Sequence, residues 1–136
     1  MAAYYEIHQA LTQSVIDLAL GLPVAYENSN FDPEVDGGSQ FIDLTTLFGE
    51  QEVISKDSVD ESPGIYQISV YTKSGVSVKT ALNTVDTILA NYRHNDTFTN
   101  GAQTVYILNS SRNAGRNDNG WYIIDISIVF KSDILR

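Results

Sequence analysis

The chain lacks cysteine altogether among its 136 residues. This absence excludes a disulfide framework and any metal site built from thiolates. The chain also lacks an uninterrupted apolar run close to the ~20 residues that span a membrane. Its first residues show no basic segment ahead of the apolar ones and include Glu6, His8 and Asp17, which is not typical of a signal peptide. We therefore expect a soluble intracellular protein or a component of an assembly.

Positive charge is scarce in the first part of the chain. Residues 1–61 contain 12 acidic residues and a single basic one, Lys56, whereas residues 62–136 contain five acidic and seven basic residues. Such a chain is a poor candidate for binding nucleic acid, because phosphate recognition needs a basic face, and we expect no sequence-specific binding. The asymmetry predicts head-to-tail contacts between copies of the chain. The alternative is that acidic loops keep the protein in solution.

Apolar periodicity predicts two amphipathic helices, over residues 4–20 and 77–93, the second with Ser77 as its N-cap. Runs of β-branched and aromatic residues predict five strands. These strands cover residues 23–28, 40–48, 64–73, 103–109 and 120–130. Two polar stretches, residues 49–63 and 109–119, are read as long loops.

The element order α-β-β-β-α-β-β predicts one α+β domain over residues 1–136, with a mostly antiparallel or mixed sheet packed against two helices. In the last strand Tyr122, Ile124, Ile126, Ile128 and Phe130 share one face, while Trp121, Asp125 and Ser127 share the other. We expect Ile124, Ile126 and Ile128 to be buried against Leu11, Val15, Val85 and Leu89 of the two helices.

One stretch resembles a calcium loop. In "DPEVDGGSQFID" the residues Asp32, Glu34, Asp36 and Asp43 stand at ligand positions of an EF-hand. Ser39, however, occupies a position that needs a hydrophobic residue, and the flanking sequence does not read as two helices. We therefore predict no metal and no cofactor, and an acidic turn that leads into an edge strand.

No catalytic constellation is evident. His8 and His94 are the only histidines, and neither has a nucleophile or a metal-ligand partner nearby in the sequence. No glycine-rich phosphate loop occurs either, so we expect a protein that is not an enzyme. Trp121, at the start of the last strand, has two readings of equal weight: it covers the edge of the core, or it anchors an interface.

Four segments, in this order, carry a family resemblance: "LPVAYENSNFDPE", "FIDLTTLFGEQ", "PGIYQISVYTKSG" and "DNGWYIIDISIVFK". Over roughly residues 20–130 the chain resembles the lambda-type phage tail terminator, or tail completion, proteins. The resemblance implies a structural protein of the virion tail, present in the host cytoplasm during assembly. It implies a homo-hexameric ring that caps the tail tube, stops its polymerisation and joins the tail to the head. The expected partners are other copies of the chain, the major tail tube protein and the head–tail connector or neck protein.

The resemblance also suggests a role for the two predicted loops, although the acidic 49–63 stretch departs from the family pattern. In a ring, both loops serve as contact arms to a neighbouring subunit or to the tube. The interface candidates are Glu50, Glu52, Asp57, Asp60, Glu61, Arg112, Arg116 and Trp121. Two alternative functions stay open: a head-completion or neck protein, and a small acidic calcium-binding module.

Overall fold

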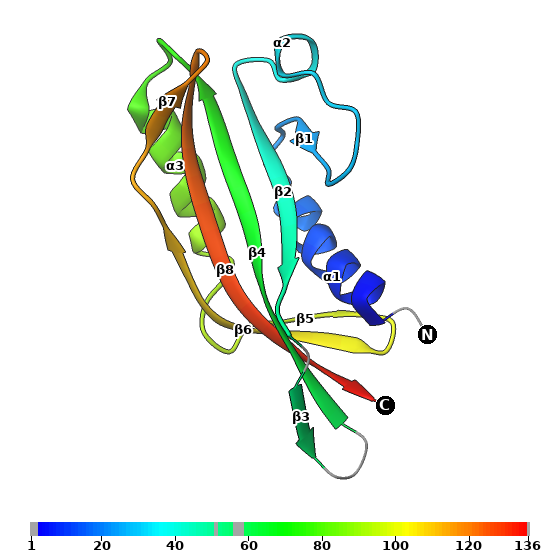
Figure 1. The fold of residues 1–136 in the computed structure, drawn as a ribbon. Helices are drawn as coiled ribbons and strands as arrows, with labels where there is room; N and C mark the ends of the chain where they lie inside the picture. The colour runs from blue at the N-terminus through cyan, green and yellow to red at the C-terminus, as the bar shows by residue number, and fades with distance from the viewer. Residues whose placement is uncertain (1–2, 51, 56–58, 136) are drawn as a thin grey trace.

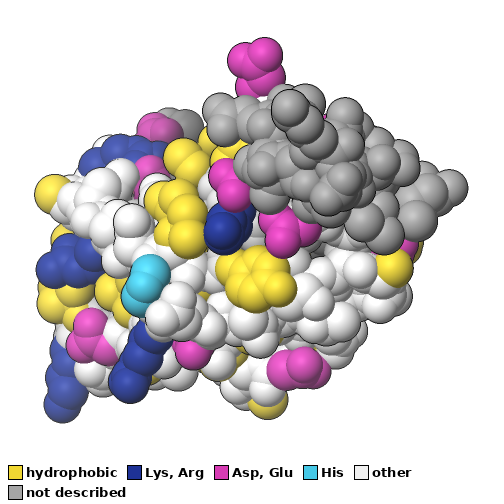
Figure 2. Space-filling model, turned by 90° about the horizontal axis from the view of Figure 1, so that it is seen from below, with side chains coloured by type: hydrophobic (Ala, Val, Ile, Leu, Met, Phe, Trp, Pro, Cys, Tyr) yellow, Lys and Arg dark blue, Asp and Glu magenta, His cyan; other side chains and the backbone are white. Residues whose placement is uncertain are grey.

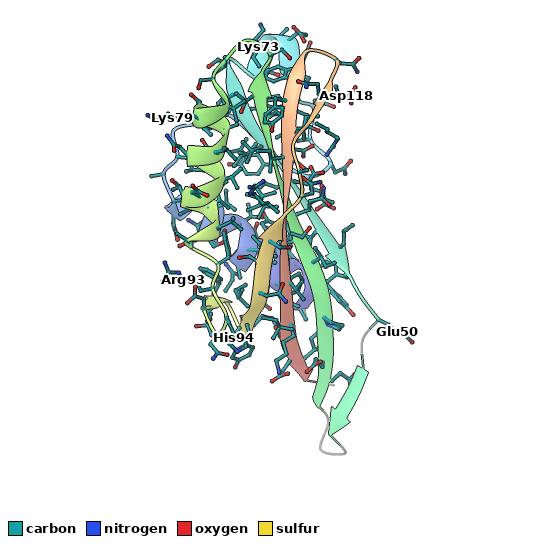
Figure 3. All side chains as sticks on the ribbon, turned by 90° about the vertical axis from the view of Figure 1, so that its left-hand side faces the viewer. Glu50, Lys73, Lys79, Arg93, His94 and Asp118 are labelled. Carbon is teal, nitrogen blue, oxygen red and sulfur yellow. The ribbon has the colours of Figure 1, made fainter. Side chains whose placement is uncertain are left out.

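The protein folds as a curled, mixed sheet that carries its two long helices on one side (Figures 1 and 3). The computed structural model describes residues 3–50, 52–55 and 59–135. The helices are α1 (Ala3–Asp17), α2 (Pro33–Asp36) and α3 (Val78–Leu89). The strands are β1 (Val24–Ala25), β2 (Gln40–Phe48), β3 (Glu52–Ser55), β4 (Val59–Lys73), β5 (Thr97–Asn100), β6 (Gln103–Arg112), β7 (Arg116–Asp118) and β8 (Trp121–Leu135). This architecture confirms the predicted α+β class.

Two long strands form the centre of the sheet. The strand order is β1-β2-β4-β8-β6-β5, in which only the β1–β2 pair is parallel. Strands β4 and β8 have 15 residues each and pair along their whole length, from Val59 opposite Leu135 to Lys73 opposite Trp121. Strand β3 also pairs with β4, and β7 also pairs with β8. The β3–β4 hairpin and the end of β8 extend beyond the helices at the lower end of Figure 1.

Both predicted helices are confirmed, with shorter C-terminal ends than expected. Helix α1 buries Ile7, Leu11 and Val15, at the spacing of an apolar helix face. It ends at Asp17, because the chain turns through positive φ at Ala19. In α3 the side chain of Ser77 accepts a hydrogen bond from the backbone nitrogen of Lys79, which confirms the predicted N-cap.

The main core lies between the helices and the inner face of the sheet. Ile124, Ile126 and Ile128 of β8 are fully buried there, as predicted from their alternation. The helical residues expected to cover them belong to the same cluster: Leu11, Val15 and Val85 are buried, and Leu89 is partly buried. The last strand was therefore oriented correctly from its period of two.

A second, smaller core covers the upper end of the outer sheet face. Trp121 is only 5% exposed, and its ring lies edge-on to that of Phe41, with the centroids 4.9 Å apart. Phe41 in turn stacks on Tyr71 at 4.5 Å. Ile123 and Ala25 complete the cluster. Of the two readings of Trp121, the structure matches the core-edge one, because its ring packs in this cluster.

The segments read as loops were assigned wrongly in part. Residues 52–55 and 59–63 are strand, because the start of β4 pairs with both β3 and the end of β8. In the second segment β6 continues to Arg112, and residues 116–118 form β7. Polar composition alone does not reveal such pairing, since a partner strand satisfies the backbone of a polar segment equally well. Residues 56–58 lie outside the described part of the chain.

Three smaller differences between the predicted and the observed elements also depend on local pairing and capping. The predicted strand over residues 23–28 is reduced to Val24–Ala25, because only these two residues pair with β2. The turn-rich segment after it contains the single helical turn α2, which Asp32 caps by accepting a hydrogen bond from the backbone nitrogen of Glu34. Strand β5 was missed, since its four residues alternate between exposed and half-buried and show no apolar run.

Candidate interaction surfaces

Arg116 and Asp125 form a local polar network on the outer sheet face. Arg116 on β7 donates a hydrogen bond to the Asp125 carboxylate on β8. Asp125 also accepts from the Ser69 hydroxyl at 2.6 Å and from the Asn113 amide at 3.0 Å. Burial alone raises the pKa of Asp125, but these three donors and the charge of Arg116 outweigh it, so that pKa lies below its ordinary value. The network fastens the 113–118 segment to β8.

Arg112 differs from Arg116 in its surroundings. Its side chain is exposed at the end of β6, and its hydrogen bond is to the backbone oxygen of the adjacent Asn113 at 3.3 Å. Within the described residues no carboxylate forms an ion pair with Arg112. Of the two arginines expected at an interface, Arg116 is paired with a carboxylate and Arg112 is not, as far as the described residues are concerned.

The three acidic interface candidates whose side chains are described have different surroundings. Glu61 forms an ion pair with Lys131 at 3.5 Å, Asp60 is buried, and Glu50 is exposed well away from the helices (Figure 3). The side chains of Glu52 and Asp57 lie outside the described part of the chain. Seen from below, the described surface mixes hydrophobic, acidic and basic side chains (Figure 2).

Two of the four residues at calcium-loop positions, Asp32 and Asp36, bond to backbone nitrogens of their own segment. Asp32 and Asp36 are engaged with the backbone of the α2 turn: Asp32 caps it, and the Asp36 carboxylate accepts from the backbone nitrogen of Asp32. Within the described residues, no group of three or more His, Cys, Asp or Glu side chains is arranged to hold a metal ion. Asp43 lies apart from the turn, on β2.

Each of the two histidines forms a hydrogen bond through its Nδ1 atom. His8 Nδ1 lies 2.9 Å from the Thr46 hydroxyl and joins α1 to β2. His94 Nδ1 lies 2.8 Å from the carbonyl oxygen of Leu108 on β6. Each contact links two elements of the fold.

In the described part of the chain, no helix is long and apolar enough to cross a membrane.

A groove that sequence reasoning missed lies on the outer face of the sheet, under the 26–33 segment. This outer groove has a volume of about 290 Å³, and its walls include the rings of Tyr26, Phe31 and Tyr71. Two carboxylates, Glu27 and Asp43, also line it. The only sequence signal for it was the alternation of β2, which places Asp43 on the face opposite Ile42.

The surroundings of Asp43 in the outer groove disfavour its charged form. Burial raises the pKa of Asp43, and the negative charge of Glu27 raises it further. Glu27 accepts a hydrogen bond from the backbone nitrogen of Thr46 at 2.7 Å, which holds the carboxylate at the edge of β2. Burial and the charge of Asp43 also raise the pKa of Tyr71. The groove therefore holds excess negative charge between aromatic walls.

Because of the strand order, the two edges of the sheet differ in their content of basic residues. Helix α2 and strands β1 and β2, which form one edge, contain no lysine or arginine. Helix α1 contains none either; it packs against β5 and β6 and reaches β2 through the side chains of Tyr4 and His8. The basic residues belong mainly to other elements: Figure 3 shows Lys79 in the first turn of α3 and Arg93 beyond the end of that helix, and Arg112 ends β6. Most of the exposed large hydrophobic side chains of the described residues belong to the elements without lysine or arginine, or directly follow β1. They are Tyr4, Tyr5, Ile16, Tyr26, Val35, Leu47 and Phe48.

Comparisons with known proteins address the fold and the family separately. A family model described as "Phage tail terminator protein" matches residues 6–130. A solved structure whose name states no function is similar to the fold, with a TM-score of 0.79 and 18% sequence identity. The similarity covers 100% of this chain and 99% of the other, and at this identity it shows the fold alone. No curated protein matches the chain.

Proposed function

Because this chain belongs to the phage tail terminator family, a family of structural phage tail proteins, we propose that it caps the tail tube as a ring of six copies. In that position it stops polymerisation of the major tail tube protein and presents a surface to the head–tail connector or neck protein. The same role places it in the virion tail, after assembly in the host cytoplasm. It acts by binding other proteins, not by catalysis.

The difference between the two edges of the sheet carries this proposal. A ring requires a heterologous contact, in which one surface of a subunit meets a different surface of the next and the rotation closes. The acidic edge of β1 and β2 also carries the exposed side chains of Tyr26, Leu47 and Phe48, whereas Arg112 ends β6 and Arg93 follows α3. Opposite charges on opposite edges favour head-to-tail association over a symmetric dimer.

The outer sheet face offers an additional apolar surface near the lower end. Leu47, Ile65 and Val129 lie side by side on β2, β4 and β8 in one row of the sheet. Leu47 is 49% exposed and Ile65 is 38% exposed. Together with Phe48 and Pro63 they line a shallow apolar groove. An exposed apolar patch of this kind marks a protein-binding surface, for which the tail tube is the expected partner.

Deleting the gene from its phage tests this function. Tails that grow to irregular lengths without the protein, and to a uniform length when the wild-type gene is supplied in trans, support the role of a terminator. Uniform tails that fail to join heads point to a neck protein instead.

Electron microscopy of the purified protein and of intact tails examines the ring directly. Calorimetry with calcium examines the metal-binding alternative, for which any saturable heat of binding counts in favour.

A further inference from the structure

We propose that Arg112 of one subunit inserts into the outer groove of the next subunit, between the aromatic walls and beside Glu27 and Asp43. This inference rests on the proposed function, because it names the residues through which neighbouring copies in the ring meet. The occupant of the groove is a second copy of this chain.

The chemistry of the groove fits a guanidinium group. Its floor is part of the outer sheet face, and the rings of Tyr26, Phe31 and Tyr71 line it. A guanidinium plane is attracted to the face of an aromatic ring, and it donates to carboxylates in a fixed fork. Asp43 and Glu27 are both acceptors within the same groove. Burial, and then the charge of Glu27, raise the pKa of Asp43, and a neighbouring cation would favour its charged form.

Arg112 has the positive charge that the residue entering the groove requires. Two other basic side chains already have partners on their own chain: Arg116 binds Asp125, and Lys131 binds Glu61. Arg112 is exposed at the opposite edge of the sheet from the groove, so that its own groove is not the one it faces. A cation at one edge and an acidic groove at the other form a contact that repeats from copy to copy.

The register of the sheet sets both features at the same level. Leu44 of β2 pairs with Ile68 of β4, Ile68 pairs with Ile126 of β8, and Ile126 pairs with Arg112 of β6. Leu44 and its neighbour Asp43 line the groove. Arg112 shares the helix-side face of its register partner Ile126, whereas Asp43 lies on the outer face. A second copy therefore presents Arg112 to the groove when it is turned about the strand direction relative to the first. Lys79 and Arg93, which lie towards the two ends of α3 (Figure 3), belong to no such row.

Charge reversal tests the contact. The Arg112→Glu variant should raise the protein concentration at which half of the subunits are assembled by about tenfold or more, as expected for a desolvated arginine at an interface. Combining it with Glu27→Arg should restore assembly. Arg93→Glu is the matched control and should assemble like the wild type. Light scattering on the purified protein and incorporation into intact tails are both measured, with the melting temperature of each variant in dilute solution.

Crosslinking gives a second readout that does not depend on charge. The chain has no cysteine, so Ser29→Cys on the rim of the groove and Arg112→Cys introduce the only thiols. A short bismaleimide should join the double variant into a ladder of covalent oligomers, whereas each single variant should give no species beyond a dimer. The absence of a ladder from assembled rings, or normal assembly of Arg112→Glu, overturns the Arg112 contact and leaves the ring intact. Wild-type protein that is absent from tails overturns the proposed function itself.

Discussion

The hydroxyl groups of Ser14 and Tyr92 lie 2.6 Å apart inside the core and join α1 to the segment that follows α3. Both side chains are buried, and Tyr92 is completely so. Burial raises the pKa of Tyr92 to about 12, although the hydrogen bond with Ser14 lowers it. A polar contact in this position holds the two helices in one relative orientation on the sheet.

Replacing Tyr92 with Phe should therefore destabilise the fold by about 0.5–1.5 kcal/mol, the usual contribution of one hydrogen bond. The cost stays in this range because the Ser14 hydroxyl keeps its bond to the carbonyl oxygen of Leu11. Urea unfolding at low protein concentration measures the change. Tyr66→Phe, which removes a longer 3.2 Å contact with Thr12, provides a comparison and should cost no more. A neutral Tyr92→Phe change would mean that packing alone positions the helices.

Ile126→Ala should cost about 2–5 kcal/mol, because the side chain is fully enclosed by the main core. Ile65→Ala is the matched control, since Ile65 lies on the outer face of the adjacent strand and is 38% exposed. It should cost well under about 2 kcal/mol. Denaturant titrations of both variants give the values. Equal costs would contradict the assignment of inner and outer faces.

Acid should weaken the fold through Asp125. The pKa of this carboxyl is lower in the folded chain than its ordinary value of 3.8, so the unfolded chain takes up the proton at the higher pH. The contribution to stability is fully present above about pH 4 and is lost as the pH falls through the folded-state pKa. In urea titrations at decreasing pH, Asp125→Asn should lose less stability than the wild type across this window. Parallel curves would exclude Asp125 as a source of acid sensitivity.

The two arginines of the 109–119 segment should behave differently in thermal unfolding. Arg116→Ser removes a donor from the half-buried Asp125 and should lower the melting temperature. Arg112→Ser removes no contact with a side chain in the described structure and should leave the melting temperature unchanged. Differential scanning fluorimetry of the dilute protein is sufficient for this comparison. Identical shifts for both variants would contradict the network around Asp125.

Assembly should be sensitive to salt. The proposed contact pairs an acidic edge with a basic one, and salt screens charges that lie at the rim of an interface. Light scattering in increasing sodium chloride should show assembly moving to higher protein concentration, while the unfolding transition of the subunit changes little. Assembly that strengthens with salt would point to an interface made by the apolar row of Leu47, Ile65 and Val129.

The sequence alone was sufficient to predict features that depend on residues within a single helix or strand. The bounds of β2 and the Ser77 cap follow from β-branched residues and from the side chain of one serine. The inward face of β8 follows from its alternation alone. These features depend on residues close together in the chain, so the sequence pattern contains them.

Features that depend on distant partners were missed. Ser62 and Ser132 are both fully buried and pair with each other, although a serine-rich, acidic segment reads as a loop. The outer groove requires the 26–33 segment to fold over β2, and nothing in that segment's composition states where it lies. The charge of Arg112 and Arg116 made both of them interface candidates, but the difference between their surroundings depends on the position of Asp125.

The placement of β8 has a consequence for synthesis on the ribosome. This strand follows all the others in the chain, yet it lies in the middle of the sheet between β4 and β6. A nascent chain that has reached residue 120 therefore holds β2–β4 and β5–β6 as two separate pieces with unpaired edges. Sheets that depend on such late, long-range strand pairing form slowly, and their unpaired strand edges are prone to aggregation until the pairing is complete. Translation must deliver residues 121–135 before these two halves become one protein.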